Sequence, residues 1–135
     1  MPSERSLAFV VAVGLSLLGI GASAHHSFTA EFDANKPLKV TGTVTKIEWQ
    51  NPHAWFYVDV KDSEGKVANW GFELATPNLL LRNGWSRSSM KVGDVVTVDA
   101  FLAKNGTNNA NARTVTLTES GKTLLAGSSA GKGAP

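Results

Sequence analysis

The stretch Ala54–Leu74, AWFYVDVKDSEGKVANWGFEL, decides the fold, because it contains two alternating segments separated by polar turn residues. In the first segment, Phe56 and the residues two and four places after it are apolar, whereas Trp55 and Tyr57 lie in the opposite phase. The second segment has apolar residues at alternate positions up to Leu74. This pattern predicts a β-hairpin that buries the side of Phe56 and turns Trp55 and Tyr57 outward.

Three further strands and a short helix are expected around this hairpin. The strands cover residues 39–49, 95–102 and 113–118. Thr76 and Pro77 form a helix-start signal ahead of a leucine-rich segment that ends at Asn83 and Gly84. The order of three strands, a helix and two strands predicts an all-β fold, a five-stranded OB-like barrel with a short helix between strands 3 and 4, and an open, meander-like β-sandwich is the alternative.

The apolar residues of the first expected strand change phase along its length. Val40 and Val44 share one phase, whereas Ile47 and Trp49 share the other. Strict alternation cannot place both pairs on one face, so we expect a bulge near Thr45. Such a bend would let the strand curl around a barrel.

The chain is expected to have four parts. They are a signal peptide at 1–24, an N-terminal lead-in at 25–36, an OB-like barrel at 37–120 and a flexible C-terminal tail at 121–135. A charged start, an uncharged run and the small residues Ala22-Ser23-Ala24 are typical of a Sec-type signal peptide that is cleaved after Ala24. We therefore expect a periplasmic or secreted protein with no membrane span after cleavage. The chain has no cysteine, so an apolar core must provide its stability.

Charge and motifs argue against two classes of function. The formal net charge is +2, and acidic and basic residues are interspersed, so the electrostatic footprint of a nucleic-acid-binding protein is missing. The sequence also contains no G-x-S-x-G, no cysteine nucleophile and no H-E-x-x-H motif. Only redox chemistry at a bound metal would make this protein an enzyme. We expect an unknown periplasmic protein or a small ligand as the partner, and no nucleic acid.

The three histidines of the chain suggest a metal site. His25 and His26 directly follow the expected cleavage site, and His53 lies in the loop between two strands. After a cut behind Ala24, the α-amine and imidazole of His25 can chelate one metal ion, and His53 can supply a third nitrogen. Such a set suits Cu(II), which heads the divalent affinity series. A cut after Ala22 would instead place His25 third, where the amine and backbone nitrogens also hold Cu(II) or Ni(II).

The remaining candidates around this site have defined roles. His26 is the substitute for His25 as a metal ligand, and Asn51 and Glu48 are expected to orient the ligands. The expected cofactor is therefore Cu(II), or none. Two structural alternatives stay open: the terminal histidines bind nothing, and His53 only bonds a nearby backbone carbonyl.

A second hypothesis assigns the outward hairpin face to binding. In this interpretation the protein is a non-enzymatic adaptor or ligand-binding module, and Trp55, Tyr57 and Arg113 dock a protein, peptide or glycan. The alternative is that Phe28 and Phe32 cover the two aromatic rings.

Several segments also carry a family resemblance. They are His25-His26-Ser27-Phe28, Glu31-Phe32-Asp33, Gly42-Thr43-Val44, Asn51-Pro52-His53-Ala54-Trp55 and Gly93-Asp94-Val95-Val96-Thr97-Val98. Together they resemble a family of small exported bacterial proteins of unknown function, and the resemblance covers nearly all of the mature chain. It implies a bacterial periplasmic setting and an OB-like fold, and it implies no activity.

Overall fold

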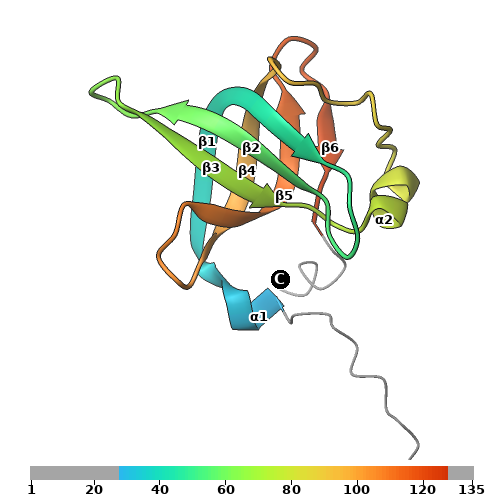
Figure 1. Ribbon diagram of the computed structural model, residues 1–135, viewed down its shortest axis with the longest axis horizontal. Coiled ribbons are helices and arrows are strands. Elements are labelled where there is room, and N and C mark those ends of the chain that lie inside the picture. The colour runs from blue at the N-terminus through green and yellow to red at the C-terminus, as the bar shows by residue number, and fades with distance from the viewer. Residues whose placement is uncertain (1–27, 128–135) are drawn as a thin grey trace, which may run out of the picture.

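The computed structural model describes residues 28–127, which form mostly β-strands (Figure 1). The elements in chain order are α1 (Phe28–Glu31), β1 (Phe32–Glu48), β2 (Trp55–Lys61), β3 (Val67–Glu73), α2 (Pro77–Arg82), β4 (Val95–Ala103), β5 (Asn109–Leu117) and β6 (Thr123–Leu125). The expected signal peptide at 1–24 lies outside the described residues. Within 28–127, no helix is long and apolar enough to cross a membrane.

All six strands belong to one sheet that closes on itself. Its order is β3-β2-β1-β4-β5-β6, and β3 also pairs with β5 in parallel. The additional pairing joins the two sides of the sheet, so β1 to β5 form a ring around one apolar core. The predicted all-β class is confirmed. The ring of strands differs from the alternative, an open, meander-like β-sandwich, because such a sandwich has no pairing that joins its two sides.

The hairpin of β2 and β3 is confirmed in position and in phase. Trp55 lies opposite Glu73 at one end of this antiparallel pair. Phe56 is fully buried and stacks on Phe72 across the hairpin, with 5.2 Å between ring centroids. Tyr57, like Trp55, is partly exposed on the outer face. The alternation of this segment was therefore sufficient to assign its two faces.

β1 is longer than expected and serves two neighbours. It pairs with β4 along its first part and with β2 along its last part. In the pairing with β2, Val44 lies opposite Val58 and Lys46 opposite Tyr57, so Thr45 is the additional residue of a bulge. The bulge predicted there is confirmed, and it turns the strand from one partner to the next.

Gly42 allows the close approach of β1 and β2 just before this bulge. A Cβ atom at Gly42 would lie 2.2 Å from the backbone oxygen of Asp59 and 2.7 Å from a methyl carbon of Val58. No side chain fits at such distances, so the strand crossing depends on glycine.

α2 closes one end of the core. Thr76 caps the helix by accepting a hydrogen bond from the backbone N–H of Leu79, and Pro77 occupies its first turn, as predicted. Leu80 of this helix and Trp85, which follows it, are both buried. The indole N–H of Trp85 donates to the carbonyl of Leu125.

The segment after residue 120, assigned to a flexible tail from sequence, contributes a strand. β6 pairs with β5 and buries Leu124. Beyond it, the backbone N–H of Ala126 donates to the carbonyl of Arg113 at 2.8 Å, and the N–H of Ala75 donates to the carbonyl of Ala126 at 2.9 Å. Ala126 thus connects the end of β3 to the middle of β5. A three-residue strand with one buried leucine is too short to give a periodic signal.

Candidate ligand pocket

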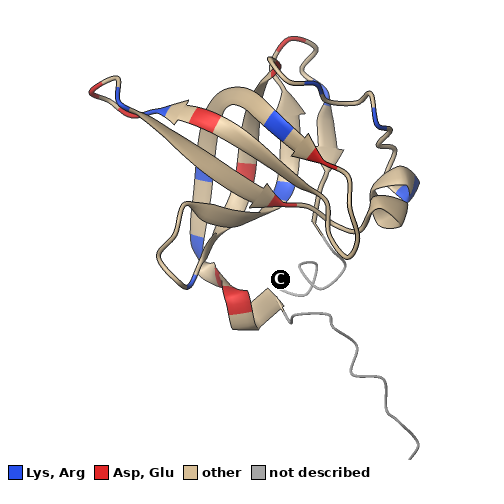
Figure 2. Cartoon of the chain, in the orientation of Figure 1, with Lys and Arg blue, Asp and Glu red and all other residues tan. Residues whose placement is uncertain are grey.

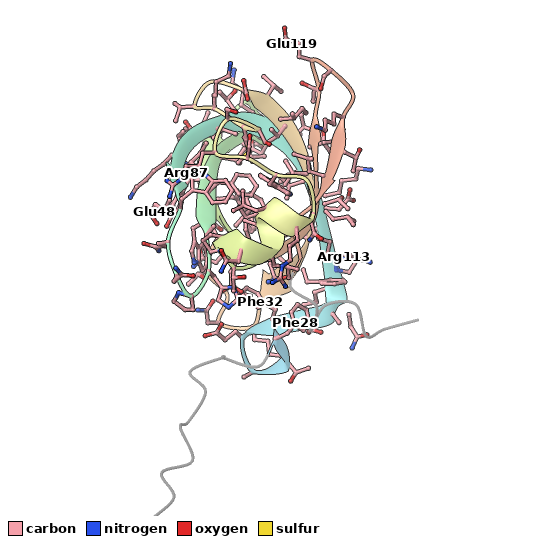
Figure 3. The ribbon with its side chains drawn as sticks, turned by 90° about the vertical axis from the view of Figure 1, so that its right-hand side faces the viewer. Phe28, Phe32, Glu48, Arg87, Arg113 and Glu119 are labelled. Atoms are coloured by element: carbon pink, nitrogen blue, oxygen red, sulfur yellow. The ribbon has the colours of Figure 1, made fainter. Side chains whose placement is uncertain are left out.

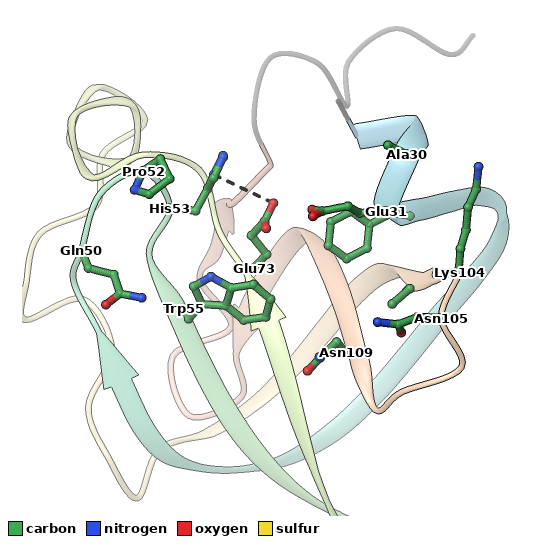
Figure 4. A pocket seen from close by; sticks show the side chains of 12 residues that line it. Ala30, Glu31, Gln50, Pro52, His53, Trp55, Glu73, Lys104, Asn105 and Asn109 are labelled. Atoms are coloured by element: carbon green, nitrogen blue, oxygen red, sulfur yellow. Dashed lines mark ion pairs between the residues drawn. The ribbon is translucent and has the colours of Figure 1, made fainter. Parts of the chain in front are cut away.

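A pocket of about 600 Å³ lies between α1, the β1–β2 loop and the β4–β5 loop (Figure 4). This volume is within the range of small-molecule sites. Two residues singled out from sequence, His53 and Trp55, lie in it together. The lining residues are Ala30, Glu31, Phe32, Gln50, Pro52, His53, Trp55, Glu73, Ala103, Lys104, Asn105 and Asn109.

His53 is held at the pocket by the backbone around it. The neighbouring Ala54 is fully buried, its N–H donates to the carbonyl of Ala75, and its carbonyl accepts from the N–H of Leu74. These bonds fix the end of the loop against the end of β3. As a result, Nδ1 of His53 lies 3.0 Å from the carbonyl oxygen of Leu74.

This contact defines the tautomer of His53. A carbonyl oxygen only accepts hydrogen bonds, so Nδ1 carries the hydrogen, and Nε2 of the neutral ring keeps its lone pair. Histidines that bind metals are held in this way, with the second ring nitrogen donating to a carbonyl or carboxylate. The same hydrogen bond is expected if His53 has only a structural role. It is therefore consistent both with a metal ligand and with a structural histidine.

Glu73 is the acidic neighbour of His53. Its Oε1 lies 3.9 Å from Nδ1 of His53, and their side chains are 12% and 15% exposed, respectively. Asn111, which is buried, donates to the same Oε1 at 3.2 Å and so orients the carboxylate. Sequence reasoning placed Glu73 only among scattered acids. Its position between the inward Phe72 and Leu74 was the signal that it shares the outer face with Trp55.

Glu48 and Asn51, expected to orient metal ligands, have other surroundings. Asn51 is exposed in the loop. Oε1 of Glu48 lies 2.6 Å from Nζ of Lys46, and Oε2 accepts a hydrogen bond of 3.3 Å from the hydroxyl of Tyr57. The structure thus brings Leu74 and Glu73, rather than Glu48, to the His53 ring.

The charges of this network shift its pKa values. The hydrogen bond with Lys46 lowers the pKa of Glu48, and the same bond raises the pKa of Lys46. Burial raises the pKa of the Tyr57 hydroxyl, and the charge of Glu48 raises it further. Beside this network, the Tyr57 ring stacks on Trp55 with 6.5 Å between centroids.

Arg113, grouped with Trp55 and Tyr57 from sequence, contacts a different ring. Its guanidinium lies 4.9 Å from the centroid of Phe101. Figure 3 shows Arg113 and Glu48 on opposite sides of the molecule. The three residues therefore do not form one surface.

An aromatic cluster on the outside of the sheet anchors α1. The ring of Phe28 lies 5.8 Å from that of Phe32 and 5.7 Å from that of Phe101, between centroids. The backbone N–H of Lys104 donates to the carbonyl of Glu31 at 2.8 Å, and Nζ donates to the carbonyl of Thr29. Phe32 lines the pocket together with Trp55, whereas the ring of Phe28 contacts those of Phe32 and Phe101.

Glu31 reaches the pocket from this anchored helix. In Figure 4 its carboxylate points toward Glu73 and His53, whereas Lys104 extends away from them. Figure 2 shows acidic and basic residues interspersed over the rest of the described chain, in line with the sequence.

The comparisons with known proteins follow this geometry. A family model described as a family of unknown function, DUF6152, matches residues 13–112. The chain belongs to this DUF6152 family. No curated protein matches the chain. A solved structure, the mitochondrial single-stranded DNA binding protein Rim1 of S. cerevisiae, is similar with 10% identity and a TM-score of 0.48, covering 72% of this chain and 98% of that one.

In this DUF6152 protein, His53 is the one histidine that lies among the described residues. Within residues 28–127, no three His, Asp or Glu side chains are grouped closely enough to hold a metal ion. His25 and His26 lie outside the described residues, shortly before Phe28.

Proposed function

We propose that this protein is an exported, periplasmic Cu(II)-binding protein with an OB-like barrel. In this proposal His25, as the mature N-terminal residue, binds through its amine and ring, and His53 supplies a second imidazole, with His26 as the substitute for His25. The observation that carries the proposal is the hydrogen bond from Nδ1 of His53 to Leu74, because it presents Nε2 as a metal donor.

The anchoring of α1 supports the pairing of the two histidine sites. Phe28 is packed against Phe32 and Phe101, and the next residues of the chain line the same pocket as His53. Each residue extends the chain by at most roughly 3.6 Å, so His25 lies within about 11 Å of Phe28.

The charges at the pocket favour a cation and set its pH dependence. Glu31 and Glu73 approach the pocket from α1 and β3, and their carboxylates lower the energy of a positive ion there. The amine of His25, with a reference pKa of about 8, must lose its proton to bind the metal. Copper affinity should therefore fall as the pH decreases.

The barrel fold in this proposal is supported by the order of the strands, and the export and the bacterial host are supported by the sequence. The ring order of the strands, with α2 between β3 and β4, supports the OB-like barrel. The signal-like start with Ala22-Ser23-Ala24 supports export and cleavage after Ala24, and we infer a bacterial host from the HHSF and NPHAW segments.

Calorimetric titration of Cu(II) into the mature protein that begins at His25 tests the proposal, with electron paramagnetic resonance to count the nitrogen ligands. We expect one ion per chain. His25→Ala and His53→Ala should each weaken binding by roughly tenfold or more. A variant with one glycine added before His25 is the matched control, because it keeps every side chain and moves only the amine. Unchanged binding in the double variant His25→Ala/His53→Ala would contradict the proposal.

A non-enzymatic module that docks a protein, peptide or glycan is the second candidate. One observation favours it: Trp55, stacked on Tyr57, lines the pocket. For this function Trp55→Ala should abolish binding of the partner, and the histidine variants should leave it unchanged.

A further inference from the structure

Trp55 lies in a cross-strand row between two glutamates. It is opposite Glu48 on β1 and opposite Glu73 on β3. Directly opposite residues on one face have Cβ atoms about 5 Å apart, so both glutamates are neighbours of Trp55 on this face. Trp55 is partly exposed and lines the pocket, which Glu31 enters from α1.

The next row of the same face already holds an ammonium group on an aromatic ring. Nζ of Lys46 lies 5.4 Å from the centroid of Tyr57 and 2.6 Å from Oε1 of Glu48. An aromatic face and a carboxylate thus bind a cation together, within the protein itself. Trp55 with Glu73 offers the same two groups, and indole is the stronger cation-binding ring.

We propose that the pocket binds a small organic cation whose primary ammonium or guanidinium group lies over Trp55 and pairs with Glu73 and Glu31. The basic residue of the lining, Lys104, turns its Nζ toward the carbonyl of Thr29. The lining thus has two carboxylates against one ammonium group, which leaves an excess of negative charge. An anion would be repelled there, and a neutral ligand would gain nothing from the carboxylates.

Size and shape favour a small molecule over a protein partner. A volume of about 600 Å³ is in the range of small-molecule sites, and Phe32 and Trp55 offer apolar surface for a short alkyl chain. Gln50, Asn105 and Asn109 supply amide groups along the lining for any polar end of the ligand. The proposed cation site uses Trp55 and does not use His53. Binding of an organic cation can therefore be tested independently of copper binding.

Titration of the metal-free mature protein with n-butylammonium, followed by NMR of the indole N–H signals, tests this inference. We expect the Trp55 signal to shift and saturate with a dissociation constant of millimolar order, and to shift less at high ionic strength. n-Butanol and pentanoate, which share the n-butyl chain, should leave the signal in place. A shift of equal size with n-butanol, or no shift with butylammonium, would overturn the proposal.

Substitutions distinguish the contribution of the Trp55 ring to butylammonium binding from that of the carboxylates. Trp55→Leu should weaken butylammonium binding by roughly two- to thirtyfold, while Trp55→Phe should retain most of it. For the tryptophan variants the readout is the Glu73 and Glu31 backbone signals. Glu73→Gln should weaken binding, whereas Glu64→Gln, the same change in the distant β2–β3 turn, should not. Equal affinities of Glu73→Gln and Glu64→Gln would refute the charge pairing.

One further variant distinguishes this inference from the proposed function. His53→Gln keeps a donor toward the carbonyl of Leu74, so we expect it to reduce Cu(II) binding and to leave butylammonium binding unchanged. Trp55→Leu should have the opposite pattern. Loss of butylammonium binding in His53→Gln, with the fold intact by circular dichroism, would show that the pocket does not use Trp55 as described.

Discussion

At Tyr57, two neighbours of opposite charge act on one hydroxyl group. Burial raises its pKa most, the charge and hydrogen bond of Glu48 raise it further, and the charge of Lys46 lowers it. Tyr57 is the single tyrosine of the chain, so the ultraviolet absorbance of tyrosinate reports this group alone.

We therefore expect the Tyr57 hydroxyl to titrate above the ordinary tyrosine pKa of about 10. Glu48→Gln should lower this pKa and Lys46→Met should raise it, because the two substitutions remove opposite charges. An absorbance titration of the three proteins measures both shifts. Shifts in the same direction would contradict the arrangement of the network.

The same shift makes a small part of the stability dependent on pH. Since the folded state favours the protonated hydroxyl, the contribution of Tyr57 is fully present below the unfolded pKa. It is lost as the pH rises through the higher folded pKa. Urea unfolding on either side of this window, compared with Tyr57→Phe, would detect the loss.

Single residues of the site were predictable to different degrees. His53 and Trp55 were identified from sequence because a loop histidine and an outward aromatic residue are visible in a strand pattern. Their shared pocket was not, since it depends on how α1 returns to the β4–β5 loop. Glu73 was missed as a neighbour of His53 because the cross-strand register that places it beside Trp55 is a property of the pair of strands.

Among the elements, β6 is the one that sequence reasoning assigned to a tail. It alternates between exposed and buried residues, with Leu124 at 3% and Leu125 at 51% exposure. Leu124→Ala should lower the free energy of unfolding by about 2–5 kcal/mol, because it leaves a cavity in the core. Leu125→Ala, the same change one residue later, should alter it by about 0.5 kcal/mol or less. Urea denaturation measures both, and equal effects would show that β6 does not close the core.

The well-predicted elements share a physical cause. In the hairpin of β2 and β3 one face is buried and the other is not, so alternation records the structure directly. The bulge at Thr45 was predictable because the phase of the apolar residues changes there. The start of β1, by contrast, includes a run of exposed residues at 34–37, so this part of the strand carries no comparable signal.

At the scale of the whole molecule, α1 connects the N-terminal segment to the pocket. Phe28 is only partly buried and lies outside the main core. If copper binds as proposed, Phe28→Ala should weaken Cu(II) binding by roughly tenfold, because the segment that carries His25 is no longer held near His53. The free energy of unfolding should change by less than about 1 kcal/mol.

Calorimetric titration and urea denaturation of the same Phe28→Ala sample test this expectation together. Leu81→Ala is the matched control, because Leu81 is an exposed apolar residue on α2, 54% accessible. Undiminished copper affinity in Phe28→Ala would mean that anchoring of α1 has no part in binding.

The position of Ala126 has a consequence for how the protein is made. The backbone N–H of Ala75, at the end of β3, finds its acceptor in Ala126, which is synthesised much later than β3 itself. In a chain that emerges N-terminus first, the N–H of Ala75 thus lacks this acceptor until Ala126 has emerged, even after β5 has closed the ring. The end of β3 therefore depends on a contact of high sequence separation, which forms only after the last described residues have been made.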